Sequence, residues 1–210
     1  MPGYLIHLAS SNEELRKNSL SFKGLVAPDL WKKETPTEEE YREFFAGETF
    51  PPSYEQVLLL CDAAHGGTHF GSKFSDTNHA DINKIVELFS NKKLNSINPF
   101  FTGYFQHLLV DKLFYKDTSI CDQEQFDADF STDKDTAMNT LHIDWDKINQ
   151  SIVTAYPEIR SSVPKLPAKA RSRIGFVNGK PVYINPVSLR AFIEKMQKFK
   201  TLDEILGALK

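Results

Sequence analysis

The chain has 210 residues and a net charge of −3 at pH 7, from 25 Lys and Arg against 28 Asp and Glu. This length fits one large domain or one domain with an extension. The charge excludes a uniformly basic nucleic-acid-binding protein, and no apolar run approaches the roughly 18–20 residues of a membrane-spanning helix. Two cysteines, and a start that does not resemble a signal peptide, are typical of a soluble, cytoplasmic protein.

The spacing of apolar residues predicts helices along most of the chain. The predicted helices start near Pro2, Thr37, Ser53, Asn78, Pro99 and Asp144. Pro28 disfavours helical backbone at Ala27, so the first helix is expected to end before Gly24–Asp29. An all-α, multi-helix bundle is therefore expected for residues 1–157.

The C-terminal part has a different pattern. Three prolines make Ile159–Ala170 a candidate linker. The segments Ile174–Phe176 and Val182–Ile184 flank an Asn-Gly turn, which predicts a short β-hairpin. Apolar periodicity predicts a last helical pair beyond Asn185. We therefore expect residues 158–210 to form an extension of hairpin plus helices that packs on the helical domain.

Charge is unevenly spread along the sequence. From Arg160 to Lys200 there are ten Lys and Arg and one acid, Glu194, which is a local balance of +9. The remainder of the chain then carries −12. Such asymmetry is typical either of a solvated face or of a surface that meets phosphate groups or an anionic membrane.

His107 and Asp111 stand in the middle of an apolar helical stripe. Residues four apart lie on one face of a helix, so both ionisable side chains are expected among Phe100, Tyr104 and Leu108. A buried carboxylate needs a partner. The sequence leaves two solutions open: one metal ion bound by both side chains, or a private His–Asp hydrogen bond.

Other histidines and aspartates occur in apolar or glycine-rich surroundings. His7 precedes the remaining motifs, which are Ala27–Asp29, Thr68–Phe70 and Gly103–His107 followed by Asp111. In order and rough spacing, this set resembles the zinc-dependent phospholipase C family, whose superfamily also includes single-strand-specific nucleases. The resemblance covers residues 1 to about 150 and implies an all-α fold that holds two or three Zn²⁺ ions.

The resemblance also implies the ligands. One metal site would contain Asp29, His69, His107 and Asp111. Asp111 would bridge to a second ion bound by His7, and Asp29 would lie close to the attacking water as the candidate catalytic residue.

A third site would use Asp117, His142 and Asp146, which depart from the family pattern of His, His and Glu. Carboxylates at these positions favour Mn²⁺, Fe²⁺ or Mg²⁺ as alternatives to Zn²⁺. Asp146 and its neighbour Asp144 have a second interpretation as residues at a helix start, where they would interact with the helix dipole.

The function expected from this set is hydrolysis of a phosphoester by metal-activated water. The substrate would be a phosphoester small molecule or a phospholipid head group. One alternative is a non-catalytic helical protein with a structural metal site or a buried His/Asp network. A second alternative is a single-strand nuclease, with nucleic acid the less favoured partner. The sequence leaves the oligomeric state open, and Cys61, beside Leu58–Leu60, is expected to be an inert core thiol.

Overall fold

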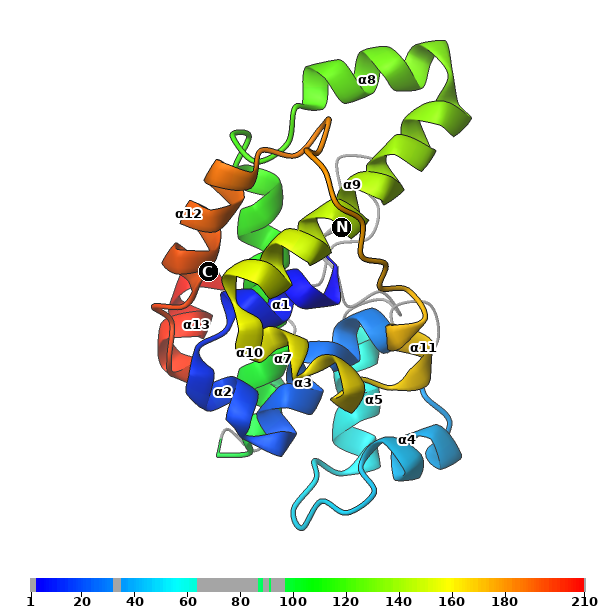
Figure 1. Cartoon of the computed structure of the whole chain (residues 1–210). Coiled ribbons are helices and arrows are strands. Elements are labelled where there is room, and N and C mark those ends of the chain that lie inside the picture. Colours follow the sequence, from blue (N-terminus) through cyan, green and yellow to red (C-terminus); the bar gives the residue numbers. More distant parts are fainter. Residues whose placement is uncertain (1–2, 32–34, 64–86, 89–90, 92–96, 210) are drawn as a thin grey trace. The chain divides into compact units, whose positions relative to one another are not determined.

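The computed structural model describes residues 3–31, 35–63, 87–88, 91 and 97–209, and these residues are mostly helical (Figure 1). The predicted all-α class is confirmed. The helix predicted after Asn78 falls largely outside the described residues. Within the described ranges, no helix combines the length and apolar character that crossing a membrane requires.

The chain forms two compact units. Unit 1 is formed by described residues of Ser11–Lys112 and Lys198–Lys210, and unit 2 by those of Pro2–Ser10 and Leu113–Gln197. The predicted boundary after residue 157 falls inside unit 2, directly after the first residue of a short helix, and it stays a prediction.

Unit 1 contains helices whose ends follow the capping signals of the sequence. They are α2 (Glu13–Lys17), α3 (Ser19–Trp31), α4 (Glu38–Phe44), α5 (Tyr54–Ala63), most of α7 (Pro99–Lys116) and α13 (Leu202–Leu209). The predicted capping box at α4 is confirmed: Thr37 Oγ1 accepts from Glu40 N at 3.2 Å, and Glu40 Oε2 accepts from Thr37 N at 2.8 Å. Ser53 and Gln56 make the same reciprocal pair before α5.

The helix break predicted at Gly24–Asp29 is wrong, and the single helix predicted from Pro2 to this point forms as separate helices. Helix α3 continues through Pro28 to Trp31. Proline tends to break a helix because it has no N–H to donate and its ring crowds the preceding turn. Pro28 stands in the last turn of α3, where only the bond to the Gly24 carbonyl is lost, and tertiary packing of the buried α3 outweighs that loss.

Glycines on α3 and α7 face each other within unit 1. A Cβ atom added to Gly24 would lie 2.7 Å from Tyr104 N and closer still to the Phe100 carbonyl oxygen. A Cβ atom added to Gly103 would lie 2.8 Å from the Ser21 carbonyl carbon. Both glycines thus let the two backbones touch, and this close approach positions the candidate site.

An aromatic cluster surrounds this helix pair. Phe45 packs edge-on against Phe100 at 5.3 Å between ring centroids, and Phe100 packs on Tyr104 at 5.8 Å. Trp31, at the end of α3, lies 4.9 Å from the ring of Phe44 on α4. Such aromatic pairs bury large areas, so they fix α4 and the ends of α3 and α7.

Unit 2 is organised around its longest helix. It contains α1 (Tyr4–Ser10), α8 (Gln123–Thr132), α9 (Lys134–Ala155), α10 (Pro157–Arg160), the 3₁₀ turn η1 (Val163–Lys165), α11 (Ala168–Arg171) and α12 (Pro186–Met196). Helices α1, α8 and α10 pack on α9, and α1 also packs on α12 (Figure 1). The predicted linker at 159–170 therefore carries short helical turns.

Helix α9 starts eleven residues earlier than the sequence predicted, with Asp133 in place of Asp144 as its cap. Asp133 caps it by accepting a hydrogen bond from Thr136 N at 3.1 Å. Asp144 and Asp146 consequently lie in the middle of the helix, and their interpretation as helix-start residues is wrong. A short acidic side chain can serve as a cap at several places in a polar stretch, and the packing of α8 against α9 decides which one does.

The predicted hairpin at 174–184 does not form, and all of these residues are described. The backbone N–H groups of Val182 and Tyr183 donate to Asp144 Oδ2, both at 2.7 Å. Earlier in the same segment, Gly175 N donates to Asp146 Oδ1 at 3.0 Å. Side chains of α9 thus satisfy donors that a hairpin would pair. The segment makes one isolated antiparallel bridge, in which Ile184 pairs with Cys121.

Candidate functional site

The candidate site in unit 1 begins with the ring of His107 on α7. Its Nδ1 lies 2.7 Å from the carbonyl oxygen of Leu25 on α3, and the ring is fully buried. A carbonyl oxygen only accepts, so Nδ1 carries the proton in this contact. Leu25 follows Gly24, and His107 lies one turn beyond Gly103, so the glycine crossing brings this donor and acceptor together.

Two buried carboxylates accompany that ring. Asp111 Oδ2 lies 3.3 Å from His107 Nε2, one helical turn along α7. Asp29, on the last turn of α3, places a carboxylate oxygen within 4.8 Å of a ring nitrogen of His107. Asp111 is fully buried and Asp29 is 4 % exposed. The structure therefore brings together three of the predicted ligands in unit 1.

The distance between His107 Nε2 and Asp111 Oδ2 decides what the pair can do. Because Nδ1 carries a proton, Nε2 of a neutral ring presents a lone pair, and an ionised carboxylate also presents only lone pairs. Two facing lone pairs repel each other, so a metal cation or a proton between the two atoms would stabilise this arrangement. Two ligand atoms about 2.0–2.1 Å from a tetrahedral metal ion lie about 3.3 Å apart, and the observed separation is 3.3 Å. A shared proton is the other solution.

Two predicted ligands stand outside this set. His7 is fully buried on α1, which belongs to unit 2. His69 lies outside the described residues. Their roles as ligands stay predictions.

The residues of the predicted third site all belong to unit 2, and each of them has different neighbours. Asp117 follows α7 and accepts hydrogen bonds from the backbone and the hydroxyl of Ser119, at 3.1 and 2.6 Å. His142 is exposed on α9, and Asp146 accepts a hydrogen bond from the backbone N–H of Gly175. Among the described residues, these three side chains do not come together as a group of ligand atoms.

Sequence reasoning missed the parts of the site that orient the ring. Neither the Leu25 carbonyl nor the glycine crossing was predicted. The available signal was a glycine inside each helical pattern, at Gly24 and Gly103, since an isolated glycine in a helix often marks close packing. Sequence reasoning also missed the role of Asp144, whose buried carboxylate accepts hydrogen bonds from the backbone of Val182 and Tyr183.

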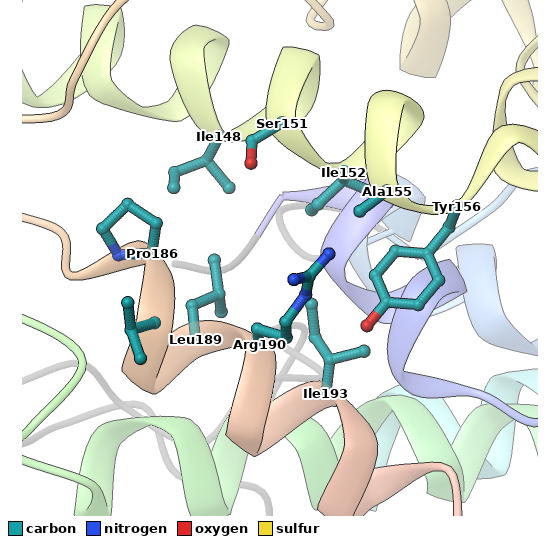
Figure 2. Close-up of a pocket in the computed structure, with 10 residues that line it drawn as sticks. Ile148, Ser151, Ile152, Ala155, Tyr156, Pro186, Leu189, Arg190 and Ile193 are labelled. Carbon is teal, nitrogen blue, oxygen red and sulfur yellow. The ribbon is translucent and has the colours of Figure 1, made fainter.

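A groove between α9 and α12 in unit 2 was not predicted either. It encloses about 280 Å³ over a floor formed by buried Ile148, Ile152 and Ile193 (Figure 2). Arg190 and Tyr156 also line it, and their side chains lie next to each other (Figure 2). Burial, together with Glu194, raises the pKa of Tyr156, while the nearby Arg190 acts in the opposite direction. The hydroxyl therefore stays protonated at neutral pH.

Cys61 on α5 is buried, and burial raises the pKa of its thiol to about 12. The thiolate is the reactive form, so its fraction at pH 8 should be about 1,000-fold lower than in an ordinary thiol of pKa 9. We expect iodoacetamide to modify Cys61 at least about 100-fold more slowly in the folded Cys121→Ser variant than in the same variant in urea. Equal rates in both states would contradict the burial of this thiol.

Comparison of the chain with protein-family models, with curated proteins and with solved structures finds no match.

Proposed function

We propose that the chain is a metal-dependent hydrolase that acts on a phosphoester. The observation that carries the proposal is the geometry of His107: its Nδ1 is fixed by the Leu25 carbonyl, and its Nε2 lies 3.3 Å from Asp111 Oδ2. That spacing fits two ligands of one tetrahedral ion. The donor set of one imidazole and carboxylates suits Zn²⁺, and also Mn²⁺ or Fe²⁺.

The residues present suit the roles that such a site requires. The Leu25 carbonyl holds the ring in one tautomer and orientation, as second-shell acceptors do for metal-binding histidines. A bound divalent cation supplies positive charge for the phosphoryl oxygens and lowers the pKa of water to about 7. Asp29, within 4.8 Å of His107, is the candidate residue to orient that water and take its proton. His7 and His69 are proposed as further ligands from the sequence resemblance.

Removal and return of the metal tests this function. Protein purified without chelator should contain at least about one ion per chain. It should hydrolyse bis(p-nitrophenyl) phosphate, lose that activity after dialysis against a chelator, and regain it with Zn²⁺ or Mn²⁺. A chain that contains no metal, or one that never cleaves the ester when loaded with each candidate ion, would overturn the proposal.

A non-catalytic protein is the alternative that fits the same 3.3 Å distance, because a proton shared between His107 and Asp111 also accounts for it. This alternative predicts that the protein hydrolyses no phosphoester and that chelation does not change its thermal unfolding midpoint. A structural metal ion would instead lower the midpoint on removal, again with no turnover. Cleavage of single-stranded DNA in place of the small ester would point to the nuclease alternative.

A further inference from the structure

One stretch of unit 2 contains positively charged side chains and no negatively charged ones. Residues 159–193 contain seven Lys and Arg and no Asp or Glu. Most of the cations are exposed, among them Lys169 on α11, Arg173 just beyond it, and Lys180 in the extended segment that follows. Figure 1 shows this segment as the gold-to-orange trace between α11 and α12. Such a run attracts an anionic surface.

The same segment exposes apolar side chains. Phe176 is 44 % exposed, Val177 40 % and Val182 56 %. Exposed apolar groups of this kind, set among charges, mark interaction surfaces when they occur together. Here they alternate with cations over only a few residues, which gives the segment Arg171–Tyr183 both an apolar and a basic character. We call this segment the basic-apolar segment.

The backbone of the basic-apolar segment is held in place by α9. Gly175 N donates to Asp146 Oδ1 at 3.0 Å, and Val177 N donates to the Asp146 carbonyl at 3.2 Å. On the other side of the bend, Lys147 Nζ donates to the Lys180 carbonyl at 3.1 Å. The anchored backbone keeps the apolar side chains presented to solvent, so little ordering cost remains when they meet a partner.

Negative charge in unit 2 is concentrated at α8. Residues 122–135, which include α8, contain six Asp and Glu and a single Lys. An anionic surface would repel this part and attract the basic-apolar segment. Tyr183, at one end of the basic-apolar segment, donates a hydrogen bond to Asp129 Oδ2 on α8 at 2.8 Å. The anionic surface would therefore meet the rest of the segment, where Arg171, Arg173 and Lys180 are exposed.

We propose that the basic-apolar segment docks unit 2 on the surface of an anionic phospholipid bilayer. The cations lie near the head groups, and Phe176, Val177 and Val182 enter the interfacial region. Each Lys or Arg close to such a surface strengthens partitioning about fivefold. A bilayer fits better than nucleic acid because single-stranded nucleic acid is bound by stacking on aromatic rings, whereas two of the three exposed apolar groups are valines. The proposal does not rest on the hydrolase activity.

Co-sedimentation of the full chain with vesicles tests it. Vesicles of phosphatidylglycerol and phosphatidylcholine in equal amounts should bind the chain in a chelating buffer, and pure phosphatidylcholine vesicles should not. The chelator separates this result from that of the metal proposal. Binding should weaken steeply as salt rises above about 0.1 M, since the attraction is screened.

Variants of the segment and matched control variants measure how much each group contributes to vesicle binding. Arg173→Glu with Lys180→Glu should weaken binding at least about 100-fold, whereas Lys116→Glu with Lys195→Glu, an equal charge change at exposed helix residues, should change it far less. Phe176→Ser with Val182→Ser should weaken binding about tenfold, and Val187→Ser on α12 should not.

Three results would overturn the proposal. They are equal binding to both vesicle types, equal loss in the segment and control variants, and retention of a single-stranded oligonucleotide in place of vesicles. The salt dependence of the unmodified chain provides an independent measurement if a segment variant fails to fold.

Discussion

Replacing Gly103 by alanine is expected to destabilise unit 1 by about 3 kcal/mol or more, as overpacking of two touching backbones does at its upper end. The added methyl group would lie 2.8 Å from the Ser21 carbonyl carbon, where neither backbone has a flexible side chain to move away. The same reasoning holds for Gly24, which faces Phe100 and Tyr104. Urea unfolding followed by circular dichroism measures the effect.

Gly207 provides the matched control for this substitution. It lies exposed in α13, also in unit 1, and a Cβ atom there would meet nothing within 4 Å. Alanine at this position should raise stability by about 0.5–1 kcal/mol, because alanine is the better helix former. Equal unfolding midpoints for the Gly103 and Gly207 variants would show that α3 and α7 do not touch in this way.

Replacing Asp111 by asparagine should lower phosphodiester hydrolysis at least about 100-fold. The amide keeps the shape of the side chain but removes the charge that would face the metal beside His107. The affinity for Zn²⁺ should fall together with the rate, and a metal-competition titration with a coloured chelator measures it. Fold content should remain, because the substitution preserves volume.

Asp135→Asn serves as the control, since Asp135 is exposed in the first turn of α9. It makes the same chemical change without touching the candidate site. A rate and metal affinity in Asp111→Asn that equal those of this control would remove Asp111 from the ligand set. A fall in thermal midpoint without any change in turnover would favour the His–Asp hydrogen bond as a structural element.

Local signals predicted many helix limits correctly because they act between near neighbours. Thr37 with Glu40, and Ser53 with Gln56, satisfy backbone N–H groups that a helix start always leaves open. The i, i+4 spacing likewise placed His107 and Asp111 on one face of α7, and the structure has them 3.3 Å apart. These relations lie within a single turn of helix, so the sequence contains them directly.

Other features depended on distant contacts. Pro28 reads as a helix break, yet α3 continues through it because its buried face packs in unit 1. The Asn-Gly pair at Asn178 reads as a hairpin turn, yet the carboxylates of Asp144 and Asp146 accept the backbone donors of that segment. Proline costs about 3 kcal/mol in a helix interior, and the packing of a buried helix outweighs that cost. The three hydrogen bonds to Asp144 and Asp146, at about 1 kcal/mol each, together outweigh a local turn preference.

The sequence by itself determined the helical class, the starts of α4, α5, α7 and α12, and the pairing of His107 with Asp111, because each follows from residues close together in the chain. The resemblance placed Asp29 in the same site, and the structure has its carboxylate within 4.8 Å of a ring nitrogen of His107. Only the tertiary structure showed that the Leu25 carbonyl fixes the ring. Those contacts link α3 to α7 across some 80 residues of chain. They exist because two glycines allow the helices to touch, and a contact of that kind depends on the shape of both surfaces at once.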